Sequence, residues 1–176
     1  MKAILLAAGL GLAAVYCIAA QEGHSGAAKP VTVEFKNAQG QNVGTALLTE
    51  GPHGVKIKLD IKNLPPGEHS IHIHQTPKCD PPDFKSAGPH FDGASSGHAE
   101  HDHSAPPAGD IPNFSLLVGA DGTAHVSVVA PNVTLGSDDH SIVANGGTAI
   151  VIHAVAGGTG SGAPARIACG IVSKPE

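Results

Sequence analysis

The sequence predicts an all-β fold, in which about eight short antiparallel strands form a sandwich or barrel. Three observations lead to this prediction. Apolar and polar residues alternate in several short segments, Gly and Pro turn signals separate those segments, and after the first twenty residues no segment longer than ten residues has helical periodicity. The chain has 176 residues, which is one domain's worth, and 41% of them are hydrophobic. Because it contains 4 Phe, 1 Tyr and no Trp, the core must consist mostly of Val, Ile, Leu and Ala.

The first half of the chain contains four strand signals. Residues 31–35 alternate as VTVEF, residues 46–48 follow a Gly-containing turn, and residues 55–62 alternate as VKIKLDIK, which is typical of a half-buried strand. The Pro-Pro-Gly sequence at 65–67 ends the third strand. Residues 70–74 then form another short strand signal.

The alternating pattern disappears between Gln75 and Pro112, a stretch of about 40 residues that is rich in Pro, Gly, Asp and His. Loops of this length are usually functional or disordered. Four further strands are predicted after the loop, with an Asp121-Gly122 turn between the first two. They cover residues 114–118, 123–130, 148–155 and 166–172.

The first residues are typical of an export signal. Lys2 supplies a positive charge, residues 3–15 form an apolar stretch too short to span a bilayer, and small residues at 18–20 offer a cleavage site. Two alternatives remain open, a lipid anchor on Cys17 and a retained membrane segment, although Tyr16 is large for lipoprotein processing. The chain therefore divides into a signal peptide at 1–20, a flexible leader at 21–29 and one β domain at 30–176, located in the periplasm or outside the cell.

The charge balance excludes some partners. The formal net charge is −5, it becomes −6 when Lys2 is removed with the signal peptide, and there is no basic run. We therefore expect no nucleic-acid binding, and membrane association only if Cys17 carries a lipid. Cleavage also leaves two cysteines, Cys79 and Cys169, and an even pair in an exported chain favours a disulfide.

Function is expected among the histidines, since seven of the 12 fall between His69 and His103. His72 and His74 flank Ile73, so on a strand they share one face about 6–7 Å apart and can bind one metal ion. The alternative is a polar strand face that binds nothing. His69, three residues before His72, is expected to support the framework.

The remaining candidates lie farther along the chain. His90 follows Gly-Pro in the long loop, and a tract at 98–103 contains three more histidines, which is typical either of metal capture or of a solvated segment. His153 ends the apolar run AIVIH, where a lone histidine is more often a packed core residue. With both cysteines oxidised, imidazole ligation favours Cu(II) or zinc.

Four motifs carry a family resemblance. GEHSIHIH, KCDPPDFKSAGPHFDG, AGDIPNF and ARIACG occur in this order, and the stretch from Val31 to Val172 resembles copper/zinc superoxide dismutase. The resemblance implies an eight-stranded Greek-key sandwich or barrel with a long metal-binding loop and a short active-site loop. It also implies dismutation of superoxide to O₂ and H₂O₂ by a His-ligated redox copper, with an arginine that guides the anion.

Matching the motifs residue by residue assigns roles to individual side chains. His90 matches the histidine that bridges the two metals, and it is expected to take up a proton and deliver it to the peroxide product. Arg166 matches the anion-guiding arginine. The cysteines match the family disulfide, which would hold the long loop beside Arg166. The resemblance implies four copper ligands, namely His72, His74, His90 and His153.

The zinc half departs from the family pattern. His90, His98 and Asp110 match zinc ligands, but the position of the third zinc histidine is Pro107, which cannot bind a metal. The aspartate that links the two metal sites in the family is replaced by Gly157. Loss of a residue that hydrogen-bonds to metal ligands, as the linking aspartate does, commonly reduces metal affinity 10–100-fold.

Three outcomes follow for zinc. His101 or His103 substitutes for the missing ligand, or the protein uses copper alone, or the tract is a weak metal-scavenging appendage. Without zinc, His90 needs another orienting partner, for which Asp92, Glu100 and Asp102 are candidates.

Two other functions compete with the enzyme. The first is an exported copper/zinc-buffering protein on a dismutase-like scaffold, and the second is a structural interaction module. The complete copper ligand set together with Arg166 favours the enzyme. The remaining histidines are expected to be surface or packing residues, and the oligomeric state is left open, a homodimer included. These histidines are His24, His53, His125 and His140.

Overall fold

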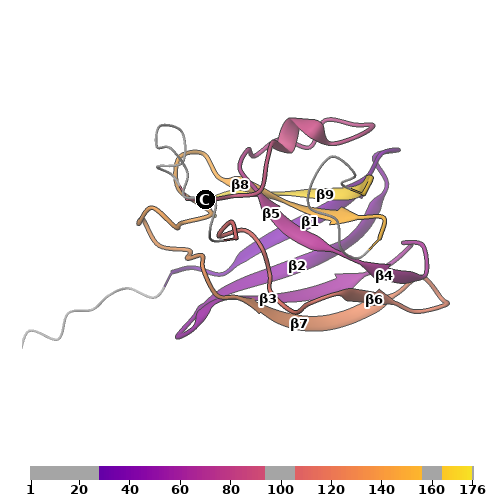
Figure 1. Cartoon of the computed structure of the whole chain (residues 1–176), viewed down its shortest axis with the longest axis horizontal. Coiled ribbons are helices and arrows are strands. Elements are labelled where there is room, and N and C mark those ends of the chain that lie inside the picture. The colour runs from indigo at the N-terminus through magenta and orange to yellow at the C-terminus, as the bar shows by residue number, and fades with distance from the viewer. Residues whose placement is uncertain (1–27, 94–105, 156–163, 176) are drawn as a thin grey trace, which may run out of the picture.

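The computed structural model describes residues 28–93, 106–155 and 164–175, and these residues form an all-β structure with one short 3-10 turn (Figure 1). The elements are β1 (Val31–Asn37), β2 (Asn42–Gly51), β3 (Gly54–Ile61), β4 (Gly67–His69), β5 (Ile71–His74), η1 (Lys85–Ala87), β6 (Leu116–Val118), β7 (Ala124–Ala130), β8 (Thr148–His153) and β9 (Arg166–Val172). Within this part of the chain, no helix has the length and hydrophobicity that a membrane span requires.

The strands curl into an antiparallel barrel. Seven of them pair in the order β5-β8-β9-β1-β2-β3-β7, and β4 pairs with β6 in a second, two-stranded sheet. The chain passes from β4 to β5 through Ser70, so one continuous segment pairs with β6 along its first part and with β8 along its second. From β3 the chain crosses to β4 instead of its own neighbour β7, which is the crossover expected of a Greek-key arrangement.

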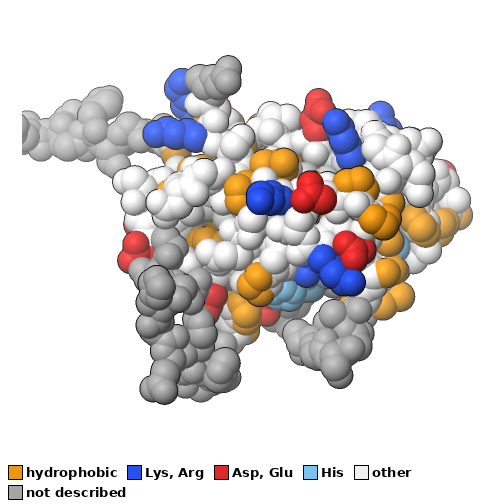
Figure 2. All heavy atoms as spheres, turned by 90° about the horizontal axis from the view of Figure 1, so that it is seen from above, with side chains coloured by type: hydrophobic (Ala, Val, Ile, Leu, Met, Phe, Trp, Pro, Cys, Tyr) orange, Lys and Arg blue, Asp and Glu red, His pale blue; other side chains and the backbone are white. Residues whose placement is uncertain are grey.

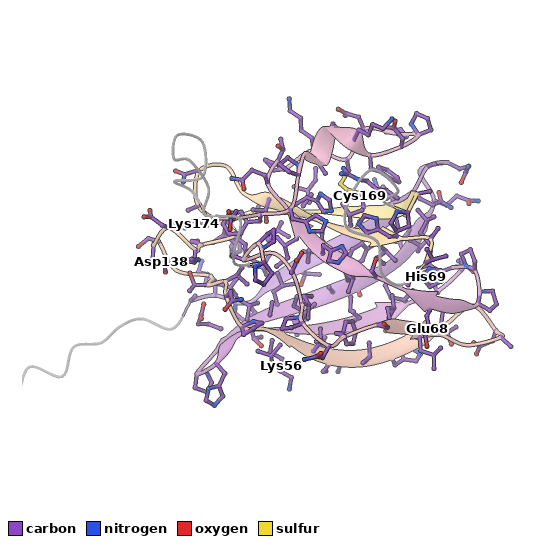
Figure 3. All side chains as sticks on the ribbon, in the orientation of Figure 1. Lys56, Glu68, His69, Asp138, Cys169 and Lys174 are labelled. Atoms are coloured by element: carbon purple, nitrogen blue, oxygen red, sulfur yellow. A yellow bond between two sulfur atoms is a disulfide. The ribbon has the colours of Figure 1, made fainter. Side chains whose placement is uncertain are left out.

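The all-β antiparallel prediction is confirmed, and the alternating segments become strands that bury every second residue. β1 and β3 place their apolar residues in the core and their polar residues outside. The described residues contain nine strands, because the predicted strand before the long loop is preceded by the separate strand β4. β4 was not predicted because its sequence, Gly-Glu-His, has no apolar alternation; Figure 3 shows Glu68 and His69 on it.

β8 differs from the other strands because all six of its residues are buried. Ile150 and Ile152 face the main core, whereas Ala149 and Val151 pack in a second cluster against Phe84 and Ala87 of the long loop. The loop therefore covers the outer face of β8, which explains the nearly continuous apolar run in its sequence.

The long loop also pairs with the free edge of β5. Ile73 N donates to Gly109 O at 3.0 Å, and Phe91 N donates to Ile73 O at 2.8 Å, so two distant parts of the loop lie beside one strand. Gly109 is required here, since a Cβ at this position would collide with the carbonyl oxygen of Ile73. This pairing brings residues 90 and 110 next to His72 and His74.

Candidate metal centre

Four histidine rings converge at the outer surface of β5 and β8. His72 and His74 come from β5, His153 ends β8, and His90 reaches them from the paired loop. One ring nitrogen from each lies within 4.8 Å of the other three. The rings of His72 and His90 are stacked, with centroids 4.3 Å apart. His74 and His153 are buried, while His72 and His90 are partly exposed, and Figure 2 shows histidine at the surface beside charged side chains.

Hydrogen bonds to backbone carbonyls fix which nitrogen faces the centre of the cluster. Nδ1 of His74 donates to Gly88 O at 2.9 Å, and Nδ1 of His153 donates to Pro164 O at 3.1 Å. Their Nε2 atoms therefore carry lone pairs, and these two atoms and Nδ1 of His72 are buried without a hydrogen-bond partner. Buried polar atoms without partners are costly, and a metal ion among these lone pairs would satisfy them.

His90 is oriented by a carboxylate. Nδ1 of His90 donates to Oδ1 of Asp110 at 2.6 Å, which leaves Nε2 as its available nitrogen. Asp110 itself is placed by the loop pairing beside β5, opposite His72. The partner of His90 is thus the residue that the sequence assigns to zinc. Of the three candidate partners, Asp92 is described, with its backbone N donating to Gln75 Oε1 at 3.3 Å, whereas Glu100 and Asp102 lie outside the described residues.

Burial keeps the imidazoles of His72, His74 and His153 neutral. Burial is the main cause that lowers the pKa of His72 to about 4 and that of His74 to about 3, and the neighbouring imidazoles lower both further. Burial likewise lowers the pKa of His153. Neutral imidazole is the form that binds a metal, so these three side chains can bind a metal ion at neutral pH without first losing a proton.

These pKa values predict that the metal-free protein loses stability in acid. Between pH 6.5 and about 4 the unfolded chain binds a proton at residue 72 that the folded chain does not, and at residue 74 this window extends to about 3. The free energy of unfolding should therefore fall by a few kcal/mol as the pH drops through this range. Denaturant titrations at several pH values measure it. A His74→Gln variant, which cannot titrate, should have a flatter profile, and an unchanged profile would contradict the assignment.

Arg166, at the start of β9, lies beside the histidine cluster. Nη1 donates to Phe84 O at 2.7 Å, and Nη2 donates to Gly88 O at 2.9 Å, the same oxygen that accepts from His74. Burial lowers the pKa of the guanidinium, and Asp83 partly opposes this effect. Arg166 is thus a partly buried cation, fixed by two carbonyl oxygens next to the histidine cluster, and such a cation can bind an anion. The two carbonyl acceptors could not be recognised from sequence, because any residue supplies a backbone oxygen.

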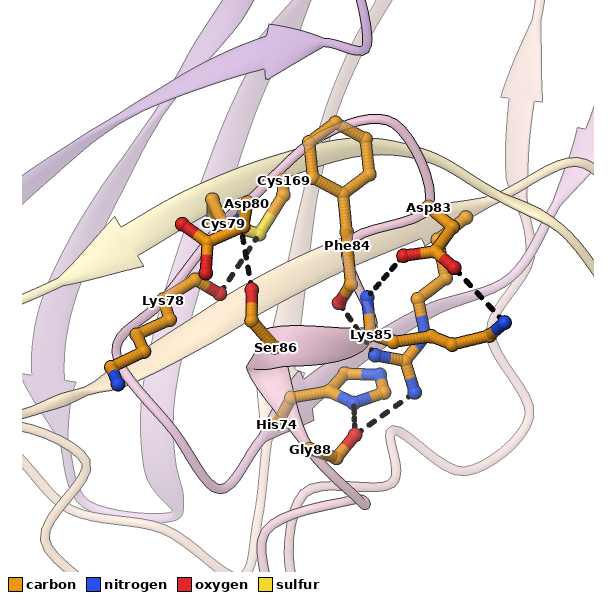
Figure 4. The surroundings of a disulfide bond; sticks show 11 residues. His74, Lys78, Cys79, Asp80, Asp83, Phe84, Lys85, Ser86, Gly88 and Cys169 are labelled. Carbon is orange, nitrogen blue, oxygen red and sulfur yellow. Dashed lines mark hydrogen bonds and ion pairs between the residues drawn. A yellow bond between two sulfur atoms is a disulfide. The ribbon is translucent and has the colours of Figure 1, made fainter.

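The predicted disulfide is confirmed. Cys79 of the loop is bonded to Cys169 of β9, with Cα atoms 5.6 Å apart and 90 residues between them in sequence. Figure 4 shows this bond beside the segment that carries Phe84 and Gly88. The disulfide therefore attaches the loop to the strand on which Arg166 lies.

The remaining histidines separate into framework and surface. The buried His69 lies between two carbonyl oxygens, with Nδ1 2.8 Å from His153 O and Nε2 2.8 Å from Pro65 O, in agreement with a supporting role. His53, His125 and His140 are exposed. The zinc candidates His98, His101 and His103, as well as His24 and Gly157, lie outside the described residues.

Comparison with known proteins gives consistent matches. The family model for copper/zinc superoxide dismutase matches residues 42–172. Superoxide dismutase [Cu-Zn] 1 of Aquifex aeolicus is 42% identical over 149 residues, covering 79% of this chain and 85% of that protein. The Escherichia coli K12 superoxide dismutase [Cu-Zn] is 33% identical over 129 residues, covering 68% and 73%.

Solved structures have the same architecture. A SOD-like protein from Bacillus subtilis superimposes with a TM-score of 0.69 at 31% identity, covering 80% of this chain and 97% of that one. The Cu/Zn superoxide dismutase from Brucella abortus superimposes with a TM-score of 0.63 at 27% identity, covering 82% and 99%. The similarity thus extends over the β domain.

Proposed function

The chain belongs to the copper/zinc superoxide dismutase family, and we propose that His72, His74, His90 and His153 bind its copper. The protein is an oxidoreductase that converts superoxide to O₂ and H₂O₂. The observation that supports the ligand set is the convergence of four imidazoles, three of which have a buried nitrogen without a partner. Nitrogen donors of this kind suit Cu(II).

When bound, the copper supplies the redox chemistry, in which one superoxide gives up an electron to form O₂ and a second accepts an electron, with two protons, to form H₂O₂. The protein contributes binding and proton transfer. Arg166 attracts the anion and holds it beside the centre through a charge-assisted hydrogen bond. His90 can take up a proton from solvent at Nε2 and then donate it to the product, while Asp110 fixes its ring through Nδ1.

Loading the purified protein with copper and assaying superoxide consumption tests this function. The copper-loaded protein should consume superoxide catalytically, and the metal-free protein should not. A copper-loaded protein that binds the metal stoichiometrically without turning over superoxide would instead support the buffering function.

We further propose that dismutation does not require zinc. The Nδ1 atom of His90 donates to Oδ1 of Asp110 at 2.6 Å, so the ring has an orienting partner within the chain itself. Pro107 occupies the position expected for a third zinc histidine.

Removing zinc from the copper-loaded protein should then change kcat/KM by much less than the roughly 10–100-fold that loss of an orienting partner costs. Metal analysis and activity are measured on the wild type and on a His101→Ala/His103→Ala variant. If either histidine completes an essential zinc site, zinc content and kcat/KM fall together in this variant, and the proposal is wrong.

Substrate guidance is expected to be local. Superoxide is an anion, and the chain also carries a negative net charge, −5. Residues 154–165, just before Arg166, contain no charged side chain. Arg166 therefore acts at short range, with little long-range steering around it. We predict that kcat/KM depends only weakly on ionic strength, measured by pulse radiolysis between low and physiological salt. A steep decline with added salt would contradict this.

We also propose that the protein is exported to the periplasm or the cell exterior after cleavage near Ala20. The disulfide supports an oxidising compartment. N-terminal sequencing of the mature protein tests the cleavage site, and mass spectrometry distinguishes it from a lipid on Cys17.

A further inference from the structure

The segment between the disulfide and His90 contains a buried phenylalanine in an unusual backbone conformation. Phe84 has φ 52° and ψ 23°, in the left-handed region that residues other than Gly, Asn and Asp rarely adopt. Its side chain is nevertheless only 2% exposed. A strained backbone persists only where the surroundings hold it, and such residues cluster at functional sites.

The residues packed around the ring fix the position of Phe84. Phe84 packs in the second cluster with Ala87 of η1, Ala149 and Val151 of β8, and Cys169 of β9. In Figure 4 the ring points away from Gly88 and from the imidazole of His74. The ring therefore attaches this point of the loop to the outer face of β8 and β9, next to the disulfide that Cys79, five residues earlier, forms with Cys169.

The carbonyl oxygen of Phe84 accepts two hydrogen bonds. Phe84 O accepts from Ala87 N at 3.1 Å, which closes η1, and from Arg166 Nη1 at 2.7 Å. At the other end of η1, Gly88 O accepts from Arg166 Nη2 at 2.9 Å. The guanidinium thus spans the two ends of one 3-10 turn, and its orientation depends on where Phe84 and Gly88 hold their carbonyl oxygens.

We propose that Phe84 is a positioning residue for Arg166: its buried ring fixes the left-handed backbone that aims its carbonyl at the guanidinium. Because the ring is packed between the loop and β8, it restrains the position of the Phe84 Cα atom and, with it, the backbone torsions that set the direction of the carbonyl. Phe84 does not touch the substrate. The proposal rests on the anion-binding role of Arg166 given under the proposed function.

A double-mutant cycle tests this coupling. Phe84→Gly removes the ring but allows the positive φ at no steric cost, so it isolates the contribution of the side chain. In the copper-loaded protein we expect kcat/KM to fall about 10-fold and the Kd of azide, a small anion followed by visible absorption, to rise by a similar factor, with copper content unchanged. In an Arg166→Ala background, Phe84→Gly should cause no further change in either quantity.

Two controls separate positioning from general destabilisation. Phe35→Leu, at a fully buried ring on β1 in the main core, should lower the thermal unfolding temperature while leaving the azide Kd unchanged. Phe84→Leu, a milder change, should show the same coupling to Arg166 at smaller amplitude if Phe84→Gly folds poorly.

Equal losses from Phe84→Gly with and without Arg166 would overturn the proposal, since the ring would then act on the whole site. An Arg166→Ala variant with unchanged kcat/KM and unchanged azide Kd would overturn the anion site itself, and the role of Phe84 with it.

Discussion

Replacing His153 with alanine is expected to abolish superoxide dismutation. His153 is buried at the end of β8, and its Nε2 atom faces the cluster without a partner, so its removal takes away one of four proposed copper ligands. Loss of an outer partner alone commonly costs 10–100-fold in metal affinity, and loss of a ligand should exceed about 100-fold. Copper content after dialysis and kcat/KM on the folded protein measure the effect.

A matched control uses a histidine away from the cluster. His140 is exposed, and its alanine variant should retain both copper and activity. Circular dichroism establishes that the His153→Ala barrel is folded, which is expected because Ile150 and Ile152 still fill the core. Retention of copper-dependent activity by His153→Ala would place the active site elsewhere.

Removing the disulfide is expected to have the largest effect on stability. The bond between Cys79 and Cys169 closes a long loop, and on the chain-entropy model it stabilises the fold by roughly 4–5 kcal/mol, with measured losses for native disulfides of about 2–5 kcal/mol. For a domain of this size each kcal/mol shifts Tm by about 2–4 °C, so a Cys79→Ser/Cys169→Ser variant should melt at least about 5–10 °C lower. Differential scanning calorimetry measures this change.

The same variant should also lose activity. The disulfide holds the start of the loop segment whose Phe84 and Gly88 carbonyls orient Arg166, so kcat/KM should fall more than copper content does. Treating the wild type with a reductant should reproduce both effects. An unchanged Tm would show that the loop is held without the bond, and an unchanged kcat/KM would separate the disulfide from the arginine.

The strands with the clearest sequence signal are those that expose one face to solvent. The alternation at 31–35 and 55–62 reports a buried and an exposed face, and the structure has both. β4 could not be predicted, because its three residues are held by pairing with β6 and not by an apolar pattern. The loop between 75 and 112 has no periodicity for the same reason: its parts at 89–91 and 109–110 bind to the edge of β5 through backbone groups.

The site divides in the same way. Strand spacing predicts that His72 and His74 share a face, but only the resemblance to the family connected them with His90 and His153, which are distant in sequence. From its position in the apolar run alone, His153 is more often a packed core residue than a metal ligand. The sequence connected Asp110 with zinc, which stays a prediction, and the structure adds that the carboxylate of Asp110 accepts a hydrogen bond from Nδ1 of His90. The acceptors of Arg166 are backbone oxygens, which leave no signal in the side chains.

Electron paramagnetic resonance of the copper-loaded protein, together with copper analysis, tests the ligand set most directly. We predict one Cu(II) per chain with superhyperfine splitting from four imidazole nitrogens, altered by substitution of any of His72, His74, His90 or His153. Substoichiometric copper, or a spectrum that these substitutions leave unchanged, would contradict the account.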